Sequence, residues 1–249
     1  MVRSLRKMRG YSIEAQDGEI GMVDDFYFDD RAWLIRYMII KLGGWFKRKE
    51  VLISPASFKE PRSSVFPLDL TREQIENSPD IDTSKPVSRQ NEREMQWYFG
   101  RPNYGGYFFG GTGTAGPTNI GNTVRPFLTE VDPRNEEDRD ESDPHLRSSR
   151  DVTGYHIHAT DGTIGHLDDY VLDTDHWVVR YLVVDTSNWI GGRKVIVSPE
   201  WVESIEWPDS IVTVGHSREE IGNSPEYDPA QGVNRALEEK LYDHYGREK

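Results

Sequence analysis

The sequence contains no cysteine. Disulfide bonds, thiolate metal ligands and cysteine nucleophiles are therefore excluded. It also has no apolar run near the roughly 18 residues that a membrane-spanning helix requires, since its strongest apolar stretch, residues 33–40, is interrupted by Arg36. The basic N-terminal residues lack the apolar segment and the small-residue cleavage site of a secretory signal. These absences predict a soluble, cytoplasmic protein with no membrane span.

Positive charge is scarce as well. The 249 residues include 43 Asp and Glu but only 30 Lys and Arg, so the formal net charge is −13. A chain of that charge repels a phosphate backbone rather than releasing its counterions, and nucleic acid is not expected as a partner. The length fits either one large domain or two small ones, so internal repetition has to decide between them.

The sequence repeats itself. Residues 10–55 align with residues 154–199 at a constant offset of 144, without a gap, and eighteen of the 46 pairs are identical. After a shift of two residues the likeness resumes between residues 70–79 and 216–225. A duplicated unit therefore predicts repeat 1 at residues 1–82, a connecting region at 83–150, repeat 2 at 151–228 and a C-terminal helix at 229–249. The repeated signature is Asp17, Gly18, Gly21, Asp24, Asp25, Trp33, Arg36, Tyr37 and Trp45 in the first copy and Asp161, Gly162, Gly165, Asp168, Asp169, Trp177, Arg180, Tyr181 and Trp189 in the second.

Apolar residues in each copy alternate with a period of two, which is typical of strands. The Asp17-Gly18 pair favours a tight hairpin between a strand at residues 11–15 and another at 20–28. Further strands are expected at residues 33–40, 49–54 and 64–68, and helices at 89–99 and 235–245. We therefore predict a mainly β protein of two tandem small β-barrels, each followed by a short α-helix.

The order of these motifs resembles the PRC-barrel domain family. The motifs are the D-G turn, I-G-x-x-D-D, W-x-x-R-Y, an apolar strand that ends in S-P, and a closing T/S-R-E-x-I-x-N-S-P. The family is similar to the cytoplasmic domain of the photosynthetic reaction-centre H subunit and to the C-terminal domain of the ribosome maturation factor RimM. The resemblance implies a small β-barrel in each half that docks onto larger assemblies, and it supplies no catalytic residue.

The two aspartate pairs, Asp24-Asp25 and Asp168-Asp169, offer neighbouring carboxylates. Adjacent residues of a strand point to opposite faces, so the two acids of a pair do not converge readily on one metal or substrate. We interpret them as structural residues that bond to turns or pair with Arg36 and Arg180.

All seven histidines follow residue 144, and three of them, His156, His158 and His166, are candidate metal ligands. The first copy has Ser12, Glu14 and Met22 at the equivalent positions, so the fold itself does not need ligands there. We expect no metal and no organic cofactor.

Seven aromatic residues gather between residues 97 and 109. They either pack on the barrel surfaces and cover strand edges or form an adhesive segment for a partner protein. These residues are Trp97, Tyr98, Phe99, Tyr104, Tyr107, Phe108 and Phe109.

Three classes of function remain open. The favoured one is a non-catalytic protein-binding or scaffold protein with a protein partner. The second is an assembly or regulatory factor that docks on a membrane complex, as the reaction-centre H subunit does, or on the ribosome, as RimM does. The third is a metal-dependent enzyme. We also expect the two barrels to pair within the chain as pseudo-symmetric halves, with further homodimerisation through residues 97–109 as an additional option.

Overall fold

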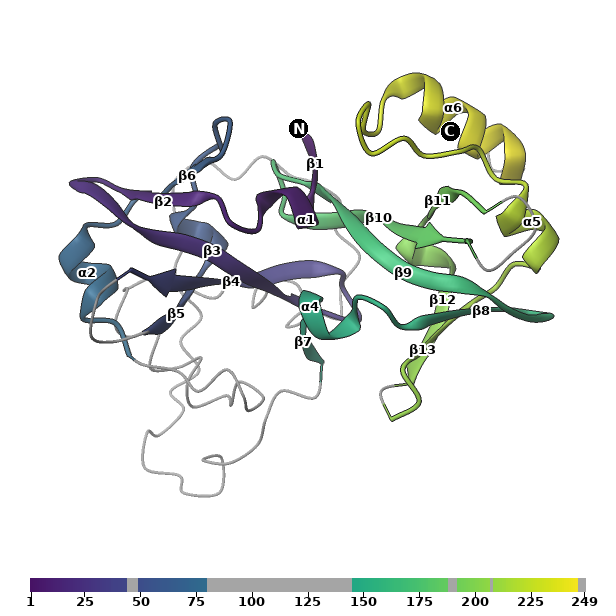
Figure 1. The fold of residues 1–249 in the computed structure, drawn as a ribbon, viewed down its shortest axis with the longest axis horizontal. Helices are drawn as coiled ribbons and strands as arrows, with labels where there is room; N and C mark the ends of the chain where they lie inside the picture. Colours follow the sequence, from purple (N-terminus) through teal and green to yellow (C-terminus); the bar gives the residue numbers. More distant parts are fainter. Residues whose placement is uncertain (44–48, 80–144, 188–191, 207, 246–249) are drawn as a thin grey trace, which may run out of the picture.

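The computed structural model describes residues 1–43, 49–79, 145–187, 192–206 and 208–245. Within this part of the chain the protein is mainly β, as predicted. The two halves of the sequence lie side by side along the long axis (Figure 1). Trp45, Trp189, the predicted helix at 89–99 and the aromatic segment 97–109 fall outside the described residues.

The first half is a small sheet with short helices at its ends. Gln16 and Asp17 form the turn of its first hairpin, one residue earlier than the predicted Asp17-Gly18 pair, and Gly18, which opens the returning strand opposite Ala15, has the positive φ of 137° that glycine tolerates best. The side chain of Asp17 also contacts a helix: its Oδ1 accepts a 2.7 Å hydrogen bond from the backbone N–H of Arg72, the first residue of that helix. The elements are β1 (Val2–Ser4), α1 (Leu5–Met8), β2 (Ser12–Ala15), β3 (Gly18–Asp29), β4 (Leu34–Leu42), β5 (Glu50–Ile53), η1 (Pro55–Ser57), β6 (Val65–Pro67) and α2 (Arg72–Glu76).

The second half repeats this arrangement. Asp161 takes the place of Asp17 and accepts a 2.8 Å hydrogen bond from the backbone N–H of Arg218. The elements are β7 (Leu146–Ser148), α4 (Ser149–Val152), β8 (His156–Ala159), β9 (Gly162–Asp173), β10 (Val178–Asp185), β11 (Lys194–Val197), η3 (Pro199–Trp201), β12 (Val202–Glu206), β13 (Ile211–Val214), α5 (Arg218–Gly222) and α6 (Arg235–Tyr245). The predicted C-terminal helix at 235–245 is confirmed by α6.

Strands of the two halves follow one another in the same order. Along the sheet the order is β12-β13-β8-β9-β10-β4-β3-β2-β6, with β11 paired to β10 and β5 paired to β4. Read from the centre outward, β10-β9-β8-β13 matches β4-β3-β2-β6, and β12 extends the second half by one strand. The duplication seen in the sequence is therefore also a duplication of topology.

The halves join where β4 and β10 meet, around Leu34 and Val178. The backbone N–H of Val179 donates to the carbonyl of Trp33, the N–H of Ile35 donates to the carbonyl of Trp177, and both distances are 2.8 Å. The two tryptophans also share a positive φ, 54° at Trp33 and 56° at Trp177. These matched contacts place a pseudo-two-fold axis at the junction.

Each half also receives a segment from the other. Strand β1, at the start of the chain, pairs antiparallel with β9 of the second half, and β7, from the start of the second half, pairs antiparallel with β3 of the first. The short helices that follow, α1 and α4, pack against the same receiving strands. In Figure 1 this exchange is visible where the purple N-terminal segment meets the green strands of the second half and the teal β7 and α4 lie beside the dark purple β3.

The hydrophobic core runs through both halves without a break. A single cluster of buried residues includes Phe26 and Phe28 of the first half together with Tyr170 and Trp177 of the second. Rings of Phe28 and Tyr170 lie 5.5 Å apart across the junction. The halves are thus paired within one chain by a shared sheet, exchanged segments and a common core.

Candidate functional site

The paired aspartates lie where the exchanged segments dock. The buried carboxylate of Asp25 accepts hydrogen bonds from the hydroxyls of Ser148 at 2.5 Å and Ser149 at 2.7 Å, and from Arg9 at 3.2 Å. Asp169, also buried, accepts from the hydroxyl of Ser4 at 2.5 Å and the backbone N–H of Arg6 at 2.9 Å. These carboxylates hold the exchanged segments in place.

The outward-facing member of each pair binds cations from both halves. Asp24 lies 2.8 Å from the ammonium group of Lys41 and 2.9 Å from the guanidinium of Arg150. Burial alone would raise the pKa of Asp24, but the hydrogen bonds from Arg150 and Lys41 outweigh it and hold the pKa below its usual value. Asp168 is placed in the same way, 2.8 Å from Arg6 and 2.5 Å from Lys194.

These partners differ from the arginines that the sequence suggested. Arg36 lies 3.4 Å from Asp29, and Arg180 lies 3.1 Å from Glu238 of α6. A signal for the partners on the exchanged segments was present in the sequence, because Ser4 and Arg6 recur as Ser148 and Arg150 at the same offset of 144, ahead of the aligned block.

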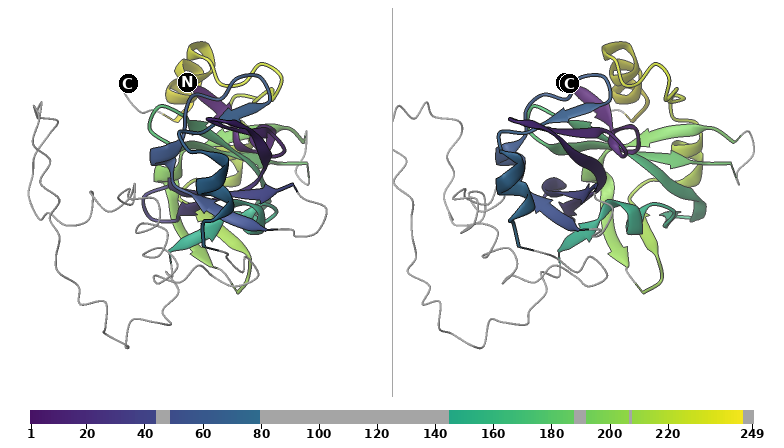
Figure 2. Two further views of the ribbon diagram at one scale, coloured as in Figure 1. Left: turned by 90° about the vertical axis from the view of Figure 1, so that its left-hand side faces the viewer. Right: turned by 60° about the vertical axis from the view of Figure 1, so that its left-hand side comes forward.

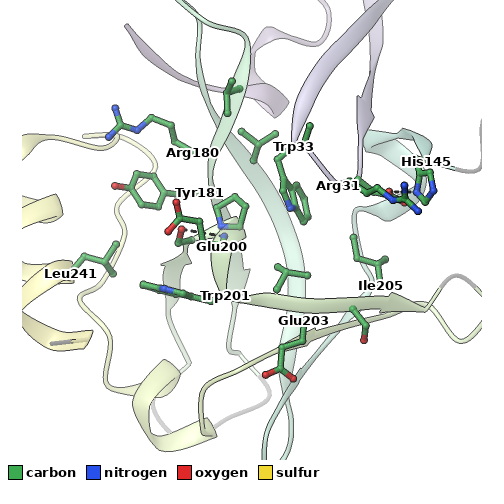
Figure 3. Close-up of a pocket in the computed structure, with 18 of the residues that line it drawn as sticks. Arg31, Trp33, His145, Arg180, Tyr181, Glu200, Trp201, Glu203, Ile205 and Leu241 are labelled. Atoms are coloured by element: carbon green, nitrogen blue, oxygen red, sulfur yellow. Dashed lines mark hydrogen bonds and ion pairs between the residues drawn. The ribbon is translucent and has the colours of Figure 1, made fainter. Parts of the chain in front are cut away.

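A groove of about 860 Å³ opens beside the junction, on the side of Trp33 (Figure 3). The buried rings of Trp33, Tyr181 and Trp201 form its walls, while Arg31 and Glu203 stand exposed at its rim. It is lined by Asp30, Arg31, Ala32, Trp33, His145, Val178, Val179, Arg180, Tyr181, Ser198, Pro199, Glu200, Trp201, Val202, Glu203, Ser204, Ile205, Leu241 and Tyr242. Sequence analysis selected Trp33, Arg180 and Tyr181 of these as signature residues and missed the rest.

Side chains beside Trp33 differ in size from their counterparts beside Trp177. On the opposite side of the axis, Trp177 packs against the rings of Phe58 at 4.7 Å and Phe66 at 5.5 Å. Strand register places Val212 where the first half has Phe66, and the offset of 144 places Val202 where it has Phe58. Two phenyl rings are thus replaced by smaller isopropyl groups beside Trp33.

Helix α6 supports the far wall of the groove. The hydroxyl of Tyr181 donates a 3.1 Å hydrogen bond to Glu238, and the ring of Tyr245 lies 4.2 Å from that of Trp201. Burial, together with the neighbouring Glu238, raises the pKa of Tyr181. Tyr181 therefore remains a neutral hydrogen-bond donor throughout the physiological range.

The floor of the groove is formed by β12, the last strand of the sheet. Four consecutive residues of β12, at positions 202–205, line the groove. Successive side chains of a strand alternate between faces, so a run of four lining residues means that the edge of the strand faces the groove. Within the described residues, β12 pairs with β13 alone.

Of the three candidate histidines, the structure brings two together. His156 of β8 lies directly opposite His166 of β9, whereas His158 lies opposite Thr163. His166 also approaches two carboxylates that the sequence analysis did not associate with it, Asp168 and Asp185. One ligand atom from each of these three residues lies within 4.8 Å of the others.

Comparison with known proteins supports the resemblance for the first half. Residues 2–74 match the family model of the PRC-barrel domain. A curated relative, an uncharacterized protein of Deinococcus radiodurans, is 28% identical over 91 residues, which cover 32% of this chain and 33% of the relative. The chain therefore matches about a third of the length of that relative. Among the described helices, none has the length and apolar character needed to cross a bilayer.

Proposed function

We propose that the protein is a non-catalytic binding protein, built from two PRC-barrel domains, that holds an extended segment of a partner protein in the groove beside Trp33. The observation that supports this proposal is the one-sided replacement of Phe58 and Phe66 by Val202 and Val212. It opens an aromatic-walled groove on one side of a molecule whose other side is filled.

The walls and floor of the groove suit a polypeptide. The rings of Trp33, Tyr181 and Trp201 offer an apolar surface with polar edges, a composition that is enriched where proteins bind other proteins. The edge of β12 offers backbone donors and acceptors to a strand added alongside it. We therefore expect an extended partner segment that places an apolar side chain against Trp33 and pairs its backbone with β12.

The first experiment asks where the partner lies. A photo-crosslinking amino acid is introduced at Ala32, which lines the groove, and in a separate variant at Met22, which is 53% exposed and does not line it. Crosslinking in cells of the source organism should give a discrete protein adduct from position 32 and none from position 22. Equal amounts of adduct from both positions would contradict the proposal that the partner lies in the groove.

The second experiment fills the groove. Val202→Phe restores the ring that Phe58 provides in the first half, and Met22→Phe adds the same ring to a surface outside the groove. With the crosslinked partner purified, Val202→Phe should weaken its binding at least about tenfold, which corresponds to about 1.4 kcal/mol. Met22→Phe should bind as the parent protein does, and both variants should keep the parent melting temperature. Unchanged affinity in a folded Val202→Phe variant would refute the proposal.

A further inference from the structure

We propose that His156, His166 and Asp185 form a binding site for one divalent transition-metal ion, with Zn²⁺ as its best match. The site lies on the outward face of β8, β9 and β10, apart from the groove. It is independent of the proposed binding function, which neither uses nor requires a metal.

The strand register brings these three side chains into one row. His156 of β8 lies opposite His166 of β9, and His166 lies opposite Asp185 of β10. Directly opposed residues of antiparallel strands share a face, with their Cβ atoms about 4.5–5.5 Å apart. One ring nitrogen of His166 and one carboxylate oxygen of Asp185 already lie within 4.8 Å of each other. A small movement of these half-buried side chains would bring both to a common ion.

At the equivalent positions of the first half, the row contains no set of metal-binding side chains. Its register places Ser12 opposite Met22 and Met22 opposite Lys41, the counterparts of His156, His166 and Asp185. All three positions have thus changed to residue types that bind metals, while Asp24 and Asp168 at the edge of the row are identical. Independent surface drift would not be expected to converge on ligand types at three facing positions.

The charge distribution has changed with them. In the first half, the ammonium group of Lys41 lies 2.8 Å from Asp24 and 3.5 Å from Glu50. In the second half, Asp185 of β10 replaces Lys41 of β4, and Lys194 of β11 replaces Glu50 of β5, so the carboxylate and the lysine have exchanged strands. An ammonium group still lies beside the equivalent aspartate, Lys194 at 2.5 Å from Asp168, but the position opposite His166 now carries a carboxylate instead of a cation.

The hydrogen bonds and ion pairs around the site determine which side-chain atoms are available to bind a metal ion. Asp168 is already engaged by Lys194 at 2.5 Å and Arg6 at 2.8 Å, so we assign it to the edge of the site rather than to the ligands. Asp185 accepts a 2.9 Å hydrogen bond from the backbone N–H of Ser187 at Oδ1, and its second oxygen can serve a metal. Within the described residues, the ring of His166 forms no hydrogen bond.

The ligand set selects the type of ion. Two imidazoles and one carboxylate suit Zn²⁺ and its neighbours in the first transition series, whereas Ca²⁺ and Mg²⁺ prefer sites made of oxygen alone. Three protein ligands leave a fourth position of a tetrahedral ion open to water or to an external donor. The nearby Lys194 and Arg6 repel a cation, so we expect binding to be weaker than at a closed structural zinc site.

The test uses the full-length protein, stripped with a chelator and titrated with ZnCl₂ by calorimetry. The parent should bind one Zn²⁺ per chain, and excess Ca²⁺ or Mg²⁺ should not displace it. His166→Met and Asp185→Lys reproduce the first-half residues, which the same fold tolerates, and each should lower the affinity at least about tenfold. His176→Ala, which removes an exposed histidine that pairs with Asp173 elsewhere, is the matched control and should bind as the parent does.

Two results would overturn the proposal. One is the absence of saturable one-to-one binding by the parent. The other is unchanged binding in His166→Met and Asp185→Lys variants whose circular dichroism and melting temperature match those of the parent, since the ion would then be held by other histidines.

Discussion

The hydroxyl of Ser148 donates a 2.5 Å hydrogen bond to the carboxylate of Asp25, 123 residues earlier in the chain. Ser4 makes the same bond to Asp169, also at 2.5 Å, in the opposite direction across the pseudo-two-fold axis. Each bond fixes a strand of one half to the sheet of the other. Neither half can therefore complete its own sheet without the segment that the other half supplies.

Asp25→Ala should lower the free energy of unfolding by about 3 kcal/mol, because it leaves Arg9, Ser148 and Ser149 without their shared buried acceptor. Asp24→Ala is the control, since the cations that its side chain contacts are largely exposed and such pairs contribute about 1 kcal/mol or less. Urea unfolding monitored by tryptophan fluorescence measures both. Equal losses in the two variants would contradict the assignment of Asp25 as the main anchor.

Because Asp24 is ion-paired in the folded protein, we expect the free energy of unfolding to depend on pH. Although burial opposes it, the hydrogen bonds from Arg150 and Lys41 lower the pKa of Asp24 below the ordinary 3.8. The unfolded chain then binds the proton more readily, so the stabilisation is present above pH 3.8 and is lost as the pH falls through the folded pKa. The difference in unfolding free energy between the parent and Asp24→Asn should shrink as the pH falls well below 3.8. A constant difference across this range would count against the ion pair.

The close approach of a neighbouring backbone carbonyl leaves no room for a side chain at Gly21. A Cβ at this position would lie 2.3 Å from the backbone carbonyl oxygen of Lys41, and Gly165 faces the carbonyl of Asp185 at 2.1 Å in the same way. Because a backbone carbonyl cannot rotate away as a side chain can, Gly21→Ala should destabilise the protein by about 1–3 kcal/mol. A Cβ at Gly43 meets no atom of the described residues within 4 Å, so Gly43→Ala should change the melting temperature little. Thermal unfolding of the two variants makes the comparison.

Local signals in the sequence were sufficient for the five strands predicted in the first half, β2 to β6. The Asp17-Gly18 pair predicts a hairpin between β2 and β3, which the structure has with its turn one residue earlier, and the period of two predicts the buried face of β2. Such signals describe a strand and its nearest neighbour in sequence. They do not state which distant strand lies on its other side, so the exchange of β1 and β7 was not predicted.

The groove and the histidine row could not be predicted for the same reason, because both depend on which distant segments lie side by side. The replacement of Phe58 by Val202 is visible in the alignment, but it has a meaning only once Trp33 is known to lie beside it. Likewise, Asp185 is separated from His166 by a turn and most of two strands, and only the register of β9 and β10 sets them opposite each other. The sequence alone thus indicated His156, His158 and His166 as candidate ligands, with no metal expected, and did not associate Asp185 with His166.

Residues 1–79 expressed alone should form a homodimer. In the intact chain, β3 receives β7 and its helix, and β1 is donated to β9. The fragment retains a donor and an acceptor but lacks both partners. Because Ser4 and Arg6 match Ser148 and Arg150, the β1 of one copy can dock on the β3 of another, and the reverse contact follows from two-fold symmetry.

In this fragment dimer, the two copies would meet through β4 as the two halves of the intact chain meet through β4 and β10. Trp33 of each copy would enter the place of Trp177 among Phe26, Phe58 and Phe66 of the other, so the fragment dimer would have two filled sides and no groove. Analytical ultracentrifugation should give twice the fragment mass, and Asp25→Ala should shift the equilibrium toward monomer because it removes the acceptor for Ser4. A fragment that sediments as a stable folded monomer would show that the first half folds without an exchanged segment, which would contradict the dependence of each half on the other.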